Sequence, residues 1–82
     1  MELKVGQVVK SKAGHDKGEL LMIAGFENNR ALLCDGKGRG LESPKPKNPK
    51  HIEATDTVLD GDSMATNRKI RKTLNKLRTQ EG

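Results

Sequence analysis

Apolar and polar residues alternate in short runs along the first half of the chain, a pattern typical of β-strands. β-Branched residues such as Val8 and Val9 favour a pleated backbone because their side chains pack well on a sheet. The pattern predicts strands at Gln7 to Lys12, Glu19 to Phe26, and Arg30 to Asp35. Glu27-Asn28-Asn29 separates the last two, and either asparagine can adopt the left-handed conformation of a hairpin loop. We therefore expect a three-stranded meander.

The second predicted strand is apolar on both faces. Leu21 and Ile23 share one face, and Leu20, Met22 and Ala24 share the other, because successive side chains of a strand point to opposite sides. Such a strand needs a covering segment on its second face, or it leaves an apolar patch exposed for a partner. We expect the single aromatic residue, Phe26, to pack in the core.

The middle of the chain is basic and rich in glycine and proline. Residues 36–40 read as a flexible loop, and Leu41-Glu42 is a candidate for a short fourth strand. Three prolines within residues 43–50 predict an extended, polyproline-like path and disfavour helix. Residues 51–54 are expected to form a last short strand, and residues 55–63 a turn-rich connection.

The hydrophobic period changes near the carboxy terminus. Ile70, Leu74 and Leu77 recur at i, i+4 and i+7, which predicts an amphipathic helix with Thr66 as its N-cap. Cations surround this narrow apolar stripe, and like charges three or four residues apart repel one another. We therefore expect the helix to be marginal alone and to gain order from the sheet or from a negatively charged surface.

The segment between the first two strands carries a family resemblance. Gly14 and Gly18 tolerate the positive φ angles of tight turns, and we expect them to shape the turn together with Asp16. The pattern of Val5-Gly6, Val9, Ala13-Gly14, Asp16 and Gly18, followed by Leu21, Ile23 and Asp35-Gly36, resembles a KOW motif. More narrowly, it resembles small bacterial KOW-domain RNA-binding proteins related to the archaeal and eukaryotic large-subunit ribosomal protein fourteen-e.

The resemblance implies a mainly β fold, an SH3-like barrel of about five strands that binds RNA in ribosomal or transcriptional assemblies. On this interpretation residues 1–55 form the barrel, residues 56–64 a connecting loop, and residues 65–79 a basic amphipathic helix. The resemblance becomes weaker after Asp35, and it ends near His51 and Ile52.

Charge supports a polyanionic partner. The chain of 82 residues carries 16 Lys and Arg against 11 Asp and Glu, a net charge of +5. Its last 22 residues hold six of those cations and two of the acids, so the carboxy-terminal end is the most basic part. With one cysteine and two separated histidines, neither a disulfide framework nor a metal site is expected. We expect a cytoplasmic, membrane-independent protein that is a monomer when free and needs no cofactor.

Three basic segments are candidates for contact with RNA, ribosomal RNA in particular. They are the first turn, the proline-lysine segment with the loop before it, and the helix. Because only one aromatic residue is present, phosphate contacts and shape recognition are expected to outweigh base stacking. The candidate RNA-binding residues are Lys12, His15, Lys17, Arg39, Lys45, Lys47, Lys50, Arg68, Lys69, Arg71, Lys72 and Lys76.

Other chemistry finds little support in the sequence. The glycines of residues 36–40 lack the spacing of a nucleotide-binding loop, and Cys34 lies in an apolar strand without a neighbouring histidine. No catalytic constellation is recognisable, so we do not expect an enzyme. The alternative to RNA binding is a protein-docking KOW module of a transcription or translation complex. In that case the two-faced strand and the helical stripe would contact a polymerase or a ribosomal protein.

Overall fold

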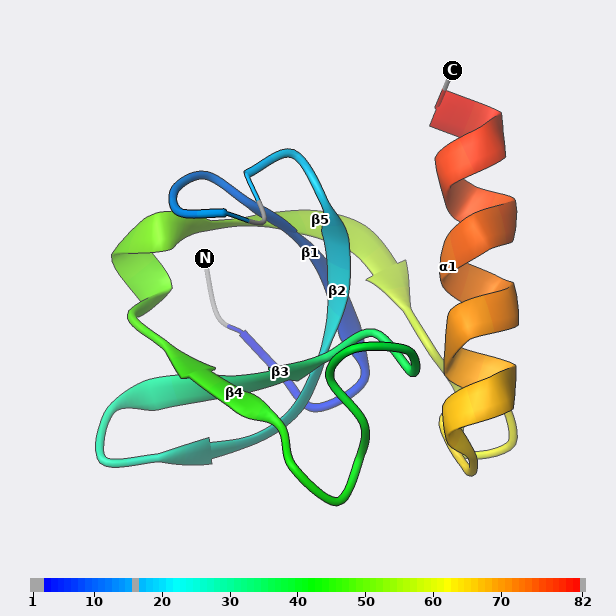
Figure 1. The fold of residues 1–82 in the computed structure, drawn as a ribbon, viewed down its shortest axis with the longest axis horizontal. Helices are drawn as coiled ribbons and strands as arrows, with labels where there is room; N and C mark the ends of the chain where they lie inside the picture. The colour runs from blue at the N-terminus through cyan, green and yellow to red at the C-terminus, as the bar shows by residue number, and fades with distance from the viewer. Residues whose placement is uncertain (1–2, 16, 82) are drawn as a thin grey trace.

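A computed structural model of the chain describes residues 3–15 and 17–81, with side chains as far as Thr79. Five antiparallel strands form one sheet in the order β4-β3-β2-β1-β5, and one helix follows (Figure 1). The prediction of a mainly β domain with about five strands and a carboxy-terminal helix is confirmed. β4 and β5 are the two edges of the sheet and do not pair with each other, so the sheet is not closed. The elements are β1 (Gln7–Ser11), β2 (Leu20–Glu27), β3 (Arg30–Cys34), β4 (Lys45–Lys47), η1 (Pro49–His51), β5 (Ile52–Val58) and α1 (Asn67–Glu81).

The meander of β1, β2 and β3 agrees with the sequence prediction. Glu27 pairs with Arg30, which leaves a two-residue hairpin turn between β2 and β3. Both turn residues are left-handed, with φ angles of 49° at Asn28 and 65° at Asn29. This is the combination that a type I′ turn requires, and its twist matches that of the flanking strands.

Two predictions for the middle of the chain were wrong: the position of the fourth strand, and the absence of any helix from the proline-lysine segment. The fourth strand is Lys45–Lys47, within the proline-lysine segment, and Leu41-Glu42 lies outside any strand. Pro46 is tolerated because β4 is an edge strand, so its missing N–H interrupts no inner ladder. The prolines also permit the short 3₁₀-helix η1, in which Pro49 takes the first helical position, where no backbone donor is needed.

The last strand is longer than predicted. β5 continues through residues 55–58, which the sequence suggested were a loop. Thr55 holds this extension against β1: its hydroxyl donates to the Val8 carbonyl at 2.7 Å, and its own carbonyl accepts from the Gln7 amide at 3.0 Å. These bonds lie where the β1–β5 register shifts, between Gln7 and Val9. The pairing of β1 with β5 therefore outweighs the turn-forming composition of the segment.

The strands curl around one face of the sheet (Figure 1), and an apolar cluster lies on that concave face. Leu21 and Ile23 of β2 lie in this cluster with residues from each of the three other long strands: Val9, Ala31, Leu33 and Ile52. No residue of α1 belongs to this cluster among the residues that the structure describes. The concave core is thus built by the sheet alone.

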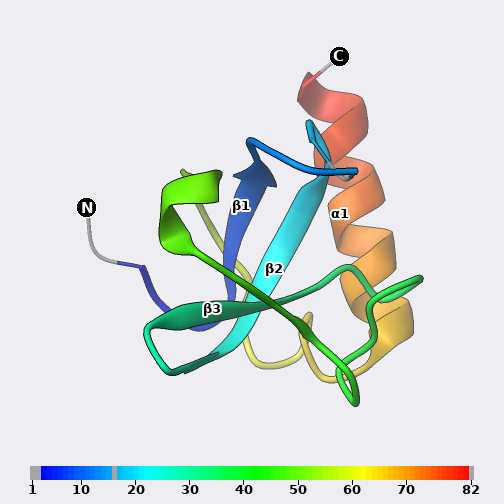
Figure 2. The same ribbon diagram turned by 60° about the vertical axis from the view of Figure 1, so that its left-hand side comes forward.

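The helix covers the opposite face. Ile70 and Leu74 are almost completely buried, at 0% and 1% exposure, against a cluster that includes Val8, Leu20 and Met22. Figure 2 shows α1 running alongside β2. The prediction that β2 is apolar on two faces is confirmed, and the covering segment is the helix of the same chain. The prediction for Phe26 was wrong: it lies near the hairpin turn and is 48% exposed.

The start of the helix is fixed by two polar residues. The Thr66 hydroxyl accepts from the Lys69 backbone N–H at 3.2 Å, as the predicted N-cap should. Asn67 accepts from the Leu41 backbone N–H at 2.7 Å and donates to the Glu42 carboxylate at 3.0 Å. These two bonds attach the β3–β4 connection to the first turn of α1, and the bond from Asn67 lowers the pKa of Glu42.

Gly36 lets the same connection approach the helix closely. Its φ angle is +77°, and a Cβ at this position would meet the backbone of Asn67 and lie 2.9 Å from the Arg71 nitrogen. Any side chain would therefore push the loop away from α1. Gly18 has a similar φ of +89° but no atom near its missing Cβ, and Gly38 has neither constraint.

Alanine substitutions at these three glycines separate the cost of a left-handed backbone from the cost of a steric clash with α1. Gly36→Ala should lower the free energy of unfolding by about 2–4 kcal/mol, because a left-handed alanine costs about 1–2 kcal/mol and the helix must also shift. Gly18→Ala should cost only the conformational part, and Gly38→Ala should change stability by less than about 0.5 kcal/mol. Urea unfolding followed by circular dichroism measures all three. Equal losses for Gly36→Ala and Gly18→Ala would contradict close packing of the loop on α1.

Candidate nucleic-acid interface

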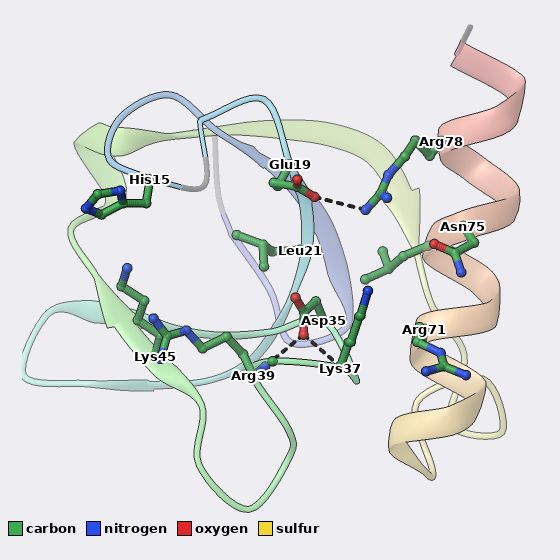
Figure 3. Close-up of a pocket in the computed structure, with 12 residues that line it drawn as sticks. His15, Glu19, Leu21, Asp35, Lys37, Arg39, Lys45, Arg71, Asn75 and Arg78 are labelled. Atoms are coloured by element: carbon green, nitrogen blue, oxygen red, sulfur yellow. Dashed lines mark hydrogen bonds and ion pairs between the residues drawn. The ribbon is translucent and has the colours of Figure 1, made fainter.

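A groove of about 740 Å³ opens between α1 and the loops at one end of the sheet (Figure 3). Residues from five segments line it: the β1–β2 loop, the start of β2, the β3–β4 loop, β4, and one flank of the helix. The lining residues are His15, Glu19, Leu21, Asp35, Lys37, Gly38, Arg39, Lys45, Arg71, Leu74, Asn75 and Arg78.

Asp35 organises the loop that forms the lower wall of the groove in Figure 3. One of its carboxylate oxygens accepts from the backbone N–H groups of Lys37 and Arg39, each at 2.9 Å. The backbone N–H groups of Asp35 and Gly36 both donate to the Arg39 carbonyl. The loop that the sequence suggested was flexible is therefore closed by four hydrogen bonds. It holds Lys37 and Arg39 at the groove.

The opposite wall is one flank of α1. Arg71, Asn75 and Arg78 follow one another at i, i+4 and i+7, so they share a side of the helix beside the buried Leu74. Arg78 reaches across to the β1–β2 loop, where its guanidinium lies 3.0 Å from the Glu19 carboxylate. Both partners are about half exposed, so this ion pair contributes little to stability. It bridges the groove at one end.

The groove is strongly cationic. Five Lys and Arg side chains line it against two carboxylates, a formal balance of +3. Both carboxylates are already engaged, Asp35 by backbone donors and Glu19 by Arg78. A concave surface lined by one sign of charge concentrates the field and attracts polyanions. The geometry thus favours binding of phosphate groups.

Four of the residues predicted from the sequence meet in this groove: His15, Arg39, Lys45 and Arg71. They come from all three basic segments, which the fold brings together. Sequence reasoning missed the five other polar members, which are Glu19, Asp35, Lys37, Asn75 and Arg78. The helical spacing of Asn75 and Arg78 from Arg71 was a usable signal, because it places them on one flank. Nothing in the sequence indicated that this flank faces the β3–β4 loop.

The remaining predicted residues lie elsewhere. The Lys47 ammonium donates to the Ser11 hydroxyl and, at 2.8 Å, to the Ala13 carbonyl, so it joins β4 to the end of β1. Lys69 pairs with Asp62 at 2.9 Å. The other six are exposed and do not line the groove. They are Lys12, Lys17 and Lys50 near the ends of β1, β2 and η1, and Arg68, Lys72 and Lys76 on the outer face of α1.

The predicted turn glycines both have positive φ angles, +88° at Gly14 and +89° at Gly18. Asp16, which the sequence placed in the same turn, lies outside the described residues. Gly14 accepts through its carbonyl from the Lys17 backbone N–H at 3.2 Å, and the Gly18 N–H donates to the Ser11 carbonyl at 2.8 Å. These bonds draw the loop tightly back onto the end of β1 and place His15 beside the groove.

Neither a candidate metal site nor a helix able to cross a membrane occurs in the described part of the chain. Within residues 3–15 and 17–81, no three His, Cys, Asp or Glu side chains gather in a way that could hold a metal ion. Over the same residues, no helix has the length and apolar character needed to cross a membrane.

Comparison with known proteins assigns no family. The chain matches no protein-family model, and no curated protein sequence is significantly similar to it.

Cys34 is buried in the cluster beneath α1 and is fully shielded from solvent. Burial raises the pKa of its thiol from 9.0 to about 11, and the nearby Asp35 and Glu42 carboxylates add to the shift. The thiol therefore stays protonated at neutral pH, which makes it a poor nucleophile.

The raised pKa predicts a loss of stability in alkali. A group whose folded pKa exceeds its unfolded value stabilises the protein fully below the unfolded pKa, and this contribution is lost as pH rises through the folded one. Between pH 8 and 11, wild type should lose about 2–3 kcal/mol more than Cys34→Ala, as two pKa units imply. Urea unfolding of both proteins across this range measures the difference. A difference independent of pH would contradict burial of the thiol.

Proposed function

We propose that the protein binds RNA, ribosomal RNA in particular, through the cationic groove between α1 and the β3–β4 loop, and that it is not an enzyme. The observation that carries the proposal is the gathering of five Lys and Arg side chains from three separate segments around one concavity. Lys and Arg contacts with phosphates supply most of the affinity of such interfaces, and they position the RNA without reading its sequence.

The fold is consistent with the KOW resemblance. We place the curled five-stranded sheet among the SH3-like folds of that kind, with the β1–β2 turn and its glycines as the KOW element. On this interpretation the protein acts in the cytoplasm, as a monomer when free, within a ribosomal assembly. The resemblance in sequence and the basic groove are independent grounds for the same partner.

Little exposed apolar surface is available for the protein-docking alternative. The helical stripe that would contact a polymerase or a ribosomal protein is occupied, because Ile70 and Leu74 pack on β2 of the same chain. The large apolar residues that remain exposed are Val5, Phe26 and Val58, each at about half exposure, among the residues that the structure describes. Single exposed apolar residues are ordinary on protein surfaces.

Charge removal at two faces tests the proposal. Lys37→Ala, Arg39→Ala and Lys45→Ala together remove three groove cations, and Arg68→Ala, Lys72→Ala and Lys76→Ala remove three from the outer face of α1. Wild type should bind purified ribosomal RNA with a log–log salt slope of roughly −3.5 to −4.5, for about five phosphates neutralised by the groove cations. The groove triple variant should flatten this slope by about 2–3, and the outer triple variant should leave it nearly unchanged.

Filter binding at several salt concentrations gives the slopes, and circular dichroism confirms that both variants fold. A wild-type slope near zero would remove the electrostatic mechanism. An outer triple variant that flattens the slope as much as the groove variant does would move the interface to the solvent face of the helix.

A substitution at Glu19 should raise the affinity for RNA, whereas the loss of groove cations should lower it. Glu19→Gln removes a carboxylate from the groove and frees Arg78 for phosphate, so the affinity for ribosomal RNA should rise about two- to fivefold at low salt. Glu53→Gln makes the same charge change on the exposed side of β5, away from the groove, and should have a smaller effect. Filter binding compares the two variants. Equal gains in affinity would indicate that binding depends on net charge alone and not on the groove.

A further inference from the structure

The floor of the groove, inside its cationic rim, is formed by the edges of two buried leucines. Leu21 and Leu74 both line it, although they are only 3% and 1% exposed, and they belong to the two different core clusters of the protein. The floor is therefore the seam where the concave core of the sheet and the core beneath the helix meet. Phosphate oxygens gain nothing at this uncharged floor, so the rim cations are the groups that would hold them.

The size of the groove suits a small group rather than a long surface. Its volume of about 740 Å³ lies within the roughly 300–1,000 Å³ of sites that enclose single small molecules. A nucleobase with its sugar is such a group. A base inside a duplex cannot reach the floor, because neighbouring base pairs cover both of its faces, whereas an unpaired base can be splayed out of the stack.

Asn75 lies at the edge of this floor, one residue after Leu74 and between Arg71 and Arg78 on the helix flank (Figure 3). Its side-chain amide carries a donor and an acceptor, and no hydrogen bond to that amide occurs within the described part of the chain. Arginine planes such as that of Arg71 can stack on bases where aromatic side chains are lacking.

We propose that the groove accommodates one unpaired nucleotide of the bound RNA. The base stacks on the Arg71 guanidinium above the floor, the Asn75 amide hydrogen-bonds its edge, and the cations of the β3–β4 loop and β4 hold the flanking phosphates. This inference rests on the proposed RNA-binding function and adds a substrate class to it: RNA with a bulged or looped-out nucleotide, in preference to continuous duplex.

Two matched RNAs test the inference: a short RNA duplex, and the same duplex with one bulged nucleotide. Fluorescence anisotropy gives the affinity of the full chain for each. The bulged RNA should bind at least tenfold more tightly. Asn75→Ala should narrow this preference at least threefold with little change in duplex affinity, and Thr79→Ala, on the same helix but outside the groove, should leave the preference intact.

Equal affinity of wild type for the two RNAs would overturn the inference, and so would an Asn75→Ala variant that keeps the full preference. The triple variant of Lys37, Arg39 and Lys45 separates this failure from failure of the proposed function. If it loses affinity for both RNAs while wild type does not distinguish them, the groove binds RNA without a nucleotide site. If neither RNA binds wild type, or the triple variant keeps full affinity, the proposed function and the inference fail together.

Discussion

The packing of α1 on the outer face of β2 is the contact on which the rest of the structure depends. β2 is apolar on both faces, and the curl of the sheet can cover only one of them. Ile70 and Leu74 cover the other and are themselves almost completely buried, which matters in a chain too short to build a large core. Because the β3–β4 connection is attached to the first turn of α1 through Gly36 and Asn67, the same contact fixes the loop that forms one wall of the groove.

The position of the helix also gives its cations different surroundings. A narrow apolar stripe leaves two flanks and an outer face, and only one flank faces the groove. Arg71 and Arg78 lie there, Lys69 on the other flank pairs with Asp62, and the outer cations face solvent. Lys47 is similarly engaged, since it joins β4 to the end of β1. Residues that look equivalent in a basic sequence therefore have different surroundings, and a count of charges overstates the interface.

Local patterns predicted the elements that local chemistry determines. The first three strands, the Asn28-Asn29 turn, the two faces of β2 and the Thr66 cap follow from alternation, turn residues and capping. The position of β4 and the extension of β5 past Thr55 were missed, because each depends on a partner strand distant in sequence. The exposure of Phe26 was missed because alternation along a strand does not show which residues near a hairpin turn the core covers. The groove was found only in part for the same reason. Its walls are assembled by tertiary contacts between α1 and the β3–β4 loop, and no short motif encodes them.

An NMR titration of ¹⁵N-labelled protein with ribosomal RNA tests the central claim most directly, because it locates the interface without changing any residue. The account predicts that backbone amide signals of the groove, those of Lys37, Arg39, Lys45 and Asn75, shift or broaden first. The signals of Arg68, Lys72 and Lys76 on the outer face of α1 should stay nearly unchanged. Changes concentrated on that outer face or on β5, or no change at all at saturating RNA, would contradict the account.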